Sequence, residues 1–358
     1  MNVLEIAKEK ISSGGRLNFD EILALYEDND LLYLAESARR VKESKTGKKI
    51  FYTVNRHINL TNVCKANCPL CAYQCRSGSN RAFTLELEDV EEVVRGQGSG
   101  VREIHIVSSL HPEKNFSYYL DAVKLVKKIL PRVGINAFTP VEIVNFAQIS
   151  GKSFSEVLSE LIQAGVTSLA GGGAEILSER VRKIICPKKC SAAEWLEVMR
   201  TAHKLGLRTN ASMMYGHIET IEERIEHLLK LRDLQDETGG FMAMMLFPFH
   251  PENTELGKKF NLRRVGSWED LKMLALSRLV LDNFAHFKAF RIMLTLPIAQ
   301  LALSFGADDL DGTIGEEKII HAAGAKSSSI ITREALEKII SEAGFQPVER
   351  DSFYREMF

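Results

Sequence analysis

From residue 50 onward, short β-branched or apolar runs alternate with longer stretches whose apolar side chains recur at helical spacing. The short runs predict strands at residues 51–60, 103–107, 134–138, 166–170, 208–213, 240–246 and 288–294, with one more near 309–310. The longer stretches predict helices at residues 85–97, 116–130, 154–164, 192–205, 221–237 and 268–284. Eight strand signals that alternate with helices indicate an α/β protein with a parallel (β/α)8-type barrel. A ferredoxin-like or doubly wound sheet is the alternative.

The two ends of the chain carry a different pattern. Residues 1–48 read as helical, and Asn18 with Glu21 forms a capping-box pattern before the apolar residues that follow. Residues 332–358 predict a helix and a short extended piece. We therefore expect a helical N-terminal extension (1–48), a barrel (49–325) and a short C-terminal cap (326–358).

Composition narrows the class of protein. The chain has 358 residues, of which 45% are hydrophobic, and this length can bury a large core. The net charge of −1 gives no basic field for nucleic acid. The N-terminus lacks the apolar core of a signal peptide, and no apolar run approaches the roughly 20 residues of a membrane span. We expect a soluble, cytoplasmic protein that acts on a small molecule, with neither nucleic acid nor membrane as partner.

Cysteines supply the strongest chemical signal. There are six, and four of them fall within residues 64–75. Such clustering in a large chain without a secretion signal argues for metal binding rather than disulfides. Cys64, Cys68 and Cys71 follow the first predicted strand with the spacing Cys-x3-Cys-x2-Cys. Three thiolates can hold three corners of a [4Fe-4S] cluster and leave its fourth iron open to an external ligand.

Two other metal sites compete with this interpretation. A structural zinc site needs four ligands, usually as two spaced pairs, and Cys75 could be the fourth. A four-cysteine electron-transfer cluster is also possible, but its usual first gap is two residues rather than three. We predict that Cys75 is not a ligand, and that Cys186 and Cys190 are ordinary thiols.

Besides the cysteines, seven further stretches of the chain carry a family resemblance. They are residues 57–59, 137–143, 171–176, 195–203, 214–220, 249–254 and 308–313. Over roughly residues 50–330 the chain resembles the branch of radical S-adenosylmethionine (SAM) enzymes that includes aminofutalosine synthase, dehypoxanthine futalosine cyclase and the deazaflavin synthases. It is most similar to aminofutalosine synthase of menaquinone biosynthesis, since the cyclase tends to show Gln-Pro at 250–251 and Gly-Ser at 311–313. Ser108 and Ser109 depart from the family, which usually has a glycine pair there.

The resemblance implies a reaction. The cluster would cleave SAM, a co-substrate, and the 5′-deoxyadenosyl radical would add to 3-[(1-carboxyvinyl)oxy]benzoate. The products would be 6-amino-6-deoxyfutalosine, methionine and bicarbonate, and a flavodoxin or ferredoxin type of donor would supply the electron. The alternatives are a hydrogen-abstracting enzyme such as the cyclase or a deazaflavin synthase, and a non-catalytic iron–sulfur protein.

The resemblance also implies roles for individual residues. Those expected to bind SAM are Leu70, Tyr73, Ser108, Ser109 and Glu175, which follows a glycine run. His217 is the candidate catalytic residue, as a proton donor or carboxylate anchor, although a structural histidine is equally possible. Candidates for substrate binding are His57, Asn59, Arg81, His250 and Arg291, because imidazole, amide and guanidinium groups can bind carboxylates.

Overall fold

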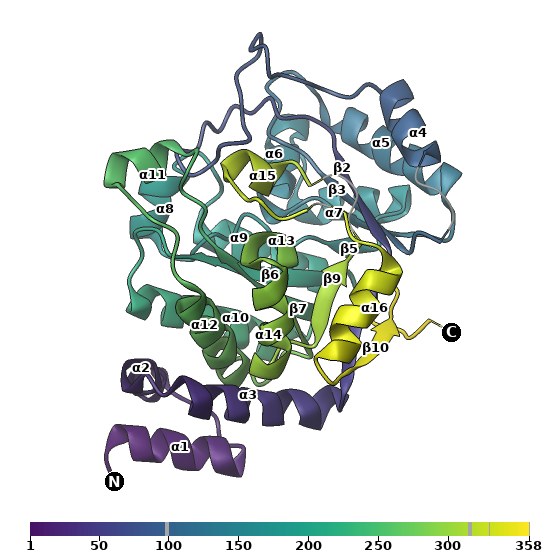
Figure 1. Ribbon diagram of the computed structural model, residues 1–358. Helices are drawn as coiled ribbons and strands as arrows, with labels where there is room; N and C mark the ends of the chain where they lie inside the picture. Colours follow the sequence, from purple (N-terminus) through teal and green to yellow (C-terminus); the bar gives the residue numbers. More distant parts are fainter. Residues whose placement is uncertain (97–99, 314–316, 329, 358) are drawn as a thin grey trace.

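The computed structural model describes residues 1–96, 100–313, 317–328 and 330–357 (Figure 1). In these ranges ten strands form one sheet in the order β10-β1-β9-β8-β7-β6-β5-β4-β3-β2, and the neighbours are parallel. The strands are β1 (Lys49–Thr53), β2 (Asn55–Asn59), β3 (Glu103–Val107), β4 (Gly134–Ala137), β5 (Ser168–Leu169), β6 (Arg208–Tyr215), β7 (Phe241–Pro248), β8 (His286–Lys288), β9 (Asp309–Gly312) and β10 (Gln346–Glu349).

One continuous segment curls this sheet into a barrel. β1 pairs with β9, whereas β2 pairs with β3, yet only Val54 separates β1 from β2. The Val54 carbonyl accepts a hydrogen bond from Arg102 N at 2.8 Å, and the neighbouring Thr53 carbonyl accepts one from Thr313 N at 3.1 Å. The predicted (β/α)8-type barrel is therefore confirmed, and the single strand predicted at 51–60 is two short strands at the seam.

Helices surround the barrel (Figure 1). They are α1 (Val3–Ser13), α2 (Phe19–Asp28), α3 (Leu31–Thr46), α4 (Leu87–Arg95), α5 (Phe116–Ile129), α6 (Pro140–Ser150), α7 (Phe154–Ala164), α8 (Glu179–Ile185), α9 (Ala192–Lys204), α10 (Ile221–Thr238), α11 (Glu255–Phe260), α12 (Ser267–Val280), α13 (Arg291–Leu294), α14 (Leu296–Ala302), α15 (Ile319–Ala323) and α16 (Arg333–Glu342). All six predicted helices are present. The helix predicted at 85–97 begins at Leu87, and its last predicted residue lies outside the described ranges.

The strand predicted at 288–294 is wrong. β8 ends at Lys288, and residues Arg291–Leu294 form the short helix α13. The Phe290 carbonyl accepts hydrogen bonds from Met293 N and Leu294 N, both at 3.1 Å, so the chain turns here rather than extends. A short apolar run fits a buried strand and a buried helix equally well, which is why the pattern misled.

Both ends of the chain pack on the barrel. The Asn18 side chain accepts from Glu21 N at 3.0 Å, and the Glu21 carboxylate accepts from Asn18 N at 2.8 Å, which confirms the predicted capping box. α3 packs along α12, and the C-terminal strand β10 extends the sheet beside β1 (Figure 1). No helix in the described ranges combines the length and the apolar character that a membrane crossing requires.

Candidate active site

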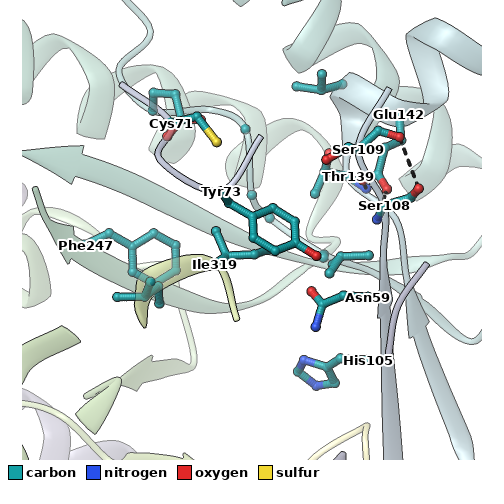
Figure 2. Close-up of a pocket in the computed structure, with 18 of the residues that line it drawn as sticks. Asn59, Cys71, Tyr73, His105, Ser108, Ser109, Thr139, Glu142, Phe247 and Ile319 are labelled. Atoms are coloured by element: carbon teal, nitrogen blue, oxygen red, sulfur yellow. Dashed lines mark hydrogen bonds between the residues drawn. The ribbon is translucent and has the colours of Figure 1, made fainter. Parts of the chain in front are cut away.

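A cavity of about 340 Å³ opens inside the barrel and at the carboxyl ends of its strands. Figure 2 shows Cys71 at one end of this cavity, Asn59 and His105 at the other, and Tyr73 between them. The predicted site residues that line it are Cys64, Cys68, Leu70, Cys71, Tyr73, Ser108, Ser109, Glu175, His57 and Asn59. Segments far apart in the sequence thus meet in one space, at the end of the barrel where such folds place their active sites.

The loop after β2 carries the cysteines. Cys64 N donates to the Cys75 carbonyl at 3.0 Å, and Cys75 N donates to the Asn62 carbonyl at 2.9 Å, which closes the loop on itself. Cys64, Cys68 and Cys71 face the cavity, but Cys75 is outside its lining. The buried Cys75 thiol instead donates to Asn62 Oδ1 at 3.4 Å. The loop therefore presents three of its four thiols to the cavity.

Three thiols on one loop offer ligands to three irons of a cubane cluster. Among the described residues, no three His, Cys, Asp or Glu side chains converge on one point as a mononuclear site requires. The corners of a cubane are separate irons, so its thiolates need not converge. Burial raises the pKa of Cys68 to about 12, and it also raises the pKa of Cys71, while Lys189 opposes both shifts. Bound iron would replace these thiol protons.

The glycine loop after β5 places an acid beside the cysteines. A Cβ on Gly171 would stand 2.4 Å from the Asn210 carbonyl oxygen, so only glycine lets the loop pass this close to β6. The loop turns at Glu175, whose φ is +49°. Glu175 Oε1 lies 2.5 Å from Lys189 Nζ, and both side chains line the cavity. Burial alone would raise the pKa of Glu175, but Lys189 holds it below its usual range.

A second acid lies beside the serine pair. Glu142, in the first turn of α6, accepts hydrogen bonds from Ser108 N and Thr139 N, each at 2.7 Å (Figure 2). Burial raises the pKa of Glu142 to about 7 despite these bonds. The Ser108 hydroxyl donates to the Ser109 carbonyl at 3.1 Å, so this hydroxyl is bonded within its own loop.

The inner end of the cavity is polar. We call His57, His105, Asn136 and Asn210 the polar floor, because all four line the cavity from the middle of barrel strands. We call the opposite part, formed by Cys64, Cys68, Cys71, Glu175 and Lys189, the cysteine end. The His57 and His105 rings stack with their centroids 4.7 Å apart, and His105 Nε2 contacts Glu103 Oε1.

Four predicted site residues are outside the lining, namely His217, Arg81, His250 and Arg291. The His217 ring is fully buried, with Nδ1 2.7 Å from Glu219 Oε2. His250 Nε2 lies 3.1 Å from the Met293 carbonyl oxygen, and Arg291 Nη1 donates to the Ser328 carbonyl at 2.6 Å. Arg81 is exposed. The geometry therefore gives none of the four direct access to a ligand in this cavity.

Sequence reasoning missed Lys189, Glu142, His105, Asn136 and Asn210. A signal was available for three of them, because His105, Asn136 and Asn210 are polar residues inside predicted strands. In a half-buried strand alternate residues share one face, and this periodicity places each of them inside the barrel. Lys189 stood between two cysteines and Glu142 near a helix start, and neither pattern indicates a cavity.

Comparison with known proteins gives two family matches. The radical SAM superfamily matches residues 58–231, and the CofH/MqnC C-terminal region matches residues 238–357. The chain is 43% identical to an aminodeoxyfutalosine synthase of Thermus thermophilus, over 98% of this chain and 94% of that protein. It is 41% identical to an aminodeoxyfutalosine synthase of Streptomyces coelicolor, over 97% and 92%.

A third relative carries a different name. The chain is 37% identical to 5-amino-6-(D-ribitylamino)uracil--L-tyrosine 4-hydroxyphenyl transferase 2 of Methanosarcina barkeri, over 96% of this chain and 89% of that protein. Among solved structures, methylornithine synthase superposes with a TM-score of 0.74 at 18% identity, covering 95% of this chain and 97% of that one. At this identity the likeness shows the fold alone.

Proposed function

The chain belongs to the radical SAM superfamily, in the group of the aminodeoxyfutalosine synthases, and from this membership we propose its reaction in detail. It joins the adenosyl group of SAM to 3-[(1-carboxyvinyl)oxy]benzoate and forms 6-amino-6-deoxyfutalosine, methionine and bicarbonate. The observation that carries the proposal is the 43% identity to one such synthase over 98% of the chain. A protein with this reaction serves the futalosine route to menaquinone.

The cysteine end supplies the ligands for a [4Fe-4S] cluster. Cys64, Cys68 and Cys71 would hold it, since these three thiols face the cavity while that of Cys75 is bonded to Asn62. When bound, the cluster would supply the electron that breaks a carbon–sulfur bond of SAM. The electron has to come from outside the chain, and a flavodoxin or ferredoxin type of donor fits this need.

Other residues of this chain would bind and orient SAM. The Glu175 carboxylate, kept charged by Lys189, can accept hydrogen bonds from the ribose hydroxyls or the amino group. Ser108, Ser109 and Glu142 line the same cavity, and we expect carbonyls of the serine pair and the Glu142 carboxyl to receive the methionine ammonium. Leu70 and Tyr73, both in the cavity lining, are placed to pack against the adenine.

The cavity walls would protect the reaction from water. Met214, Met245, Phe247, Phe290 and Met293 give the cavity an apolar wall. Such side chains carry no proton that hydrogen-bonds to water, and they enclose a flat aromatic ring well. A reactive carbon in this belt meets few polar groups, which favours addition to substrate over side reactions.

The decisive experiment is an anaerobic incubation of the iron-loaded protein with SAM, reductant and 3-[(1-carboxyvinyl)oxy]benzoate, read by mass spectrometry. We expect adenosyl joined to the substrate and little free 5′-deoxyadenosine. A protein that makes mostly free 5′-deoxyadenosine and leaves the benzoate intact would contradict the proposal.

A hydrogen-abstracting reaction is the second candidate. The 37% identity to a tyrosine 4-hydroxyphenyl transferase over 96% of the chain favours it over a non-catalytic iron–sulfur protein. Incubation with tyrosine and the ribitylaminouracil, under the same conditions, separates the two reactions. Tyrosine consumption with release of 5′-deoxyadenosine would establish the second candidate.

A further inference from the structure

We propose that the polar floor binds the ring carboxylate of the aromatic substrate, so that the enol ether points toward the cysteine end. This inference rests on the proposed function and deepens it, because it gives the substrate one orientation in the cavity. It also assigns binding roles to Asn136 and Asn210, beside the sequence candidate His57.

Strand register brings the polar floor together. His57 on β2 is opposite His105 on β3, and His105 is opposite Asn136 on β4. Asn210 joins them from β6, and all four side chains face the cavity. Branched apolar side chains normally fill this layer of a barrel. A polar layer that opens into the cavity is therefore a departure that a ligand would explain.

The polar floor has unused hydrogen-bonding capacity. His57 Nε2, Asn136 Oδ1 and Asn210 Oδ1 are buried and have no hydrogen-bond partner among the described residues. Buried polar atoms of this kind destabilise a protein unless a ligand or ordered water satisfies them. Rotation of an amide exchanges its oxygen and nitrogen, so Asn136 and Asn210 can each present N–H donors instead. Two amides and an imidazole suit the two oxygens of a carboxylate.

The charged groups near the polar floor are compatible with a bound anion. Glu103 contacts His105, and Asp311, which also lines the cavity, has its Oδ1 3.4 Å from Lys288 Nζ, so both of these acids have a basic partner. Burial lowers the pKa of His57 to about 3, which keeps this ring neutral near pH 7. A neutral imidazole has one N–H to donate. The carboxylate would thus be received by neutral donors and not by an unpaired acid.

The cavity walls fix the direction of the ring. The apolar side chains Met245, Phe247 and Phe290 line the same cavity as the polar floor and the cysteine end, and Figure 2 shows Phe247 and Ile319 in it. An aromatic ring packs well against methionine and phenylalanine. With its carboxylate on the polar floor, the ring carries its ether substituent toward Cys64, Cys68 and Cys71. The vinyl carbon then faces the part of the cavity that would hold SAM.

The test compares two ligands on the iron-loaded protein without reductant, so that binding is measured and no turnover occurs. The ligands are 3-[(1-carboxyvinyl)oxy]benzoate and (1-carboxyvinyl)oxybenzene, which lacks only the ring carboxylate. We expect the wild type to bind the first roughly 10- to 100-fold more tightly, as for a charged group with buried partners. His57→Phe and Asn136→Leu should bring that ratio close to one.

Two further variants distinguish a specific loss of carboxylate binding from a general disturbance of the cavity. Ser168→Ala is the matched control, because Ser168 is buried and opposite Asn136 in the sheet but is outside the cavity lining. It should keep the wild-type ratio. Asn136→Asp preserves size and adds a negative charge, so it should weaken binding of the ring-carboxylate ligand while sparing the other. Iron content and far-UV circular dichroism identify variants that misfold.

The outcomes separate this inference from the proposed function. A wild-type ratio near one would overturn the binding role of the polar floor, whether or not adduct forms on reduction. Equal loss of both ligands in His57→Phe and Asn136→Asp would also overturn it, since these residues would then only shape the cavity. In a third outcome, the wild type shows a large ratio that the floor variants abolish and yet forms no adenosyl adduct on reduction. That result would support the binding role of the polar floor and contradict the proposed synthase reaction.

Discussion

The two ends of the cavity are built from the sequence in opposite ways. Two segments supply the cysteine end, namely the loop at 64–71 and the stretch from Glu175 to Lys189. The polar floor takes one residue from each of four strands, β2, β3, β4 and β6. The spacing of cysteines within one short segment is enough to predict a metal site. Residues on separate strands can be recognised as one site only when the register of those strands is known. The comparison predicts that variants of the cysteine end affect cluster and SAM, and that floor variants affect the substrate.

The largest effect should come from the cysteine loop itself. Cys68→Ala should lose both iron and activity, because the cluster needs each of three thiolates. Cys75→Ala should keep most of both, since the Cys75 thiol is bonded to Asn62 outside the cavity lining. Iron analysis after anaerobic reconstitution measures the iron content of each variant, and adduct formation measures its activity. If both variants lost iron equally, four thiols would hold the metal, and the model of an open iron would fall.

The next effect concerns the buried ion pair of the cysteine end. Lys189→Met should lower the free energy of unfolding by about 3–5 kcal/mol, because it leaves the Glu175 carboxylate buried without its partner 2.5 Å away. Urea unfolding of the metal-free protein measures this. Lys188→Met is the matched control, since the neighbouring side chain is exposed and should change little. The double variant Lys189→Met/Glu175→Leu should recover most of the loss, and failure to recover would refute the pairing.

Glu142 belongs to neither end of the cavity, and it tests how burial acts on a carboxyl beside Ser108. Burial in the folded protein raises the pKa of Glu142 from the ordinary 4.5 to about 7, so folding favours the protonated form. This group therefore weakens the fold as pH rises from about 4.5 to about 7, by up to about 3 kcal/mol. Glu142→Gln removes the titration, so the stability of the wild type relative to this variant should fall across that range. Parallel pH profiles for the two proteins would show that Glu142 ionises normally.

A smaller effect distinguishes SAM binding from packing. Glu175→Gln should weaken SAM binding by about 1.5–3 kcal/mol, the usual value for a hydrogen bond to a charged group. Equilibrium dialysis with labelled SAM measures the change. Glu197→Gln, on an exposed position of α9, is the control. Unchanged SAM affinity in Glu175→Gln would remove this carboxylate from the binding site and leave it only its partnership with Lys189.

The same comparison explains how far the sequence alone could reach. The alternation of runs predicted the barrel, and spacing predicted that Cys64, Cys68 and Cys71 act together. Neither signal could show that the strand β8 ends before the helix α13 begins, because a short apolar run fits a strand and a helix equally well. The ion pair between Lys189 and Glu175 was also out of reach, because the two residues meet only when α8 and the turn after it bring Lys189 back to the glycine loop. For the polar floor, the alternating pattern could show which residues face inward, but only the register of β2, β3 and β4 shows that His57, His105 and Asn136 are neighbours.

The smallest effect on the chemistry should come from His217, the candidate that sequence reasoning placed in the active site. Its side chain is fully buried, its Nδ1 lies 2.7 Å from Glu219 Oε2, and it is outside the cavity lining. His217→Ala should therefore lower stability by about 1–3 kcal/mol through the lost contacts of a buried ring, yet leave the ratio of adduct to free 5′-deoxyadenosine unchanged. Phe247→Ala is the positive control, because Phe247 lines the cavity. Its loss should let the radical react elsewhere and lower the ratio of adduct to free 5′-deoxyadenosine. A ratio that falls in His217→Ala as far as in Phe247→Ala would restore the histidine to the active site. It would also show that the ligand reaches beyond the cavity that the cysteine end and the polar floor enclose.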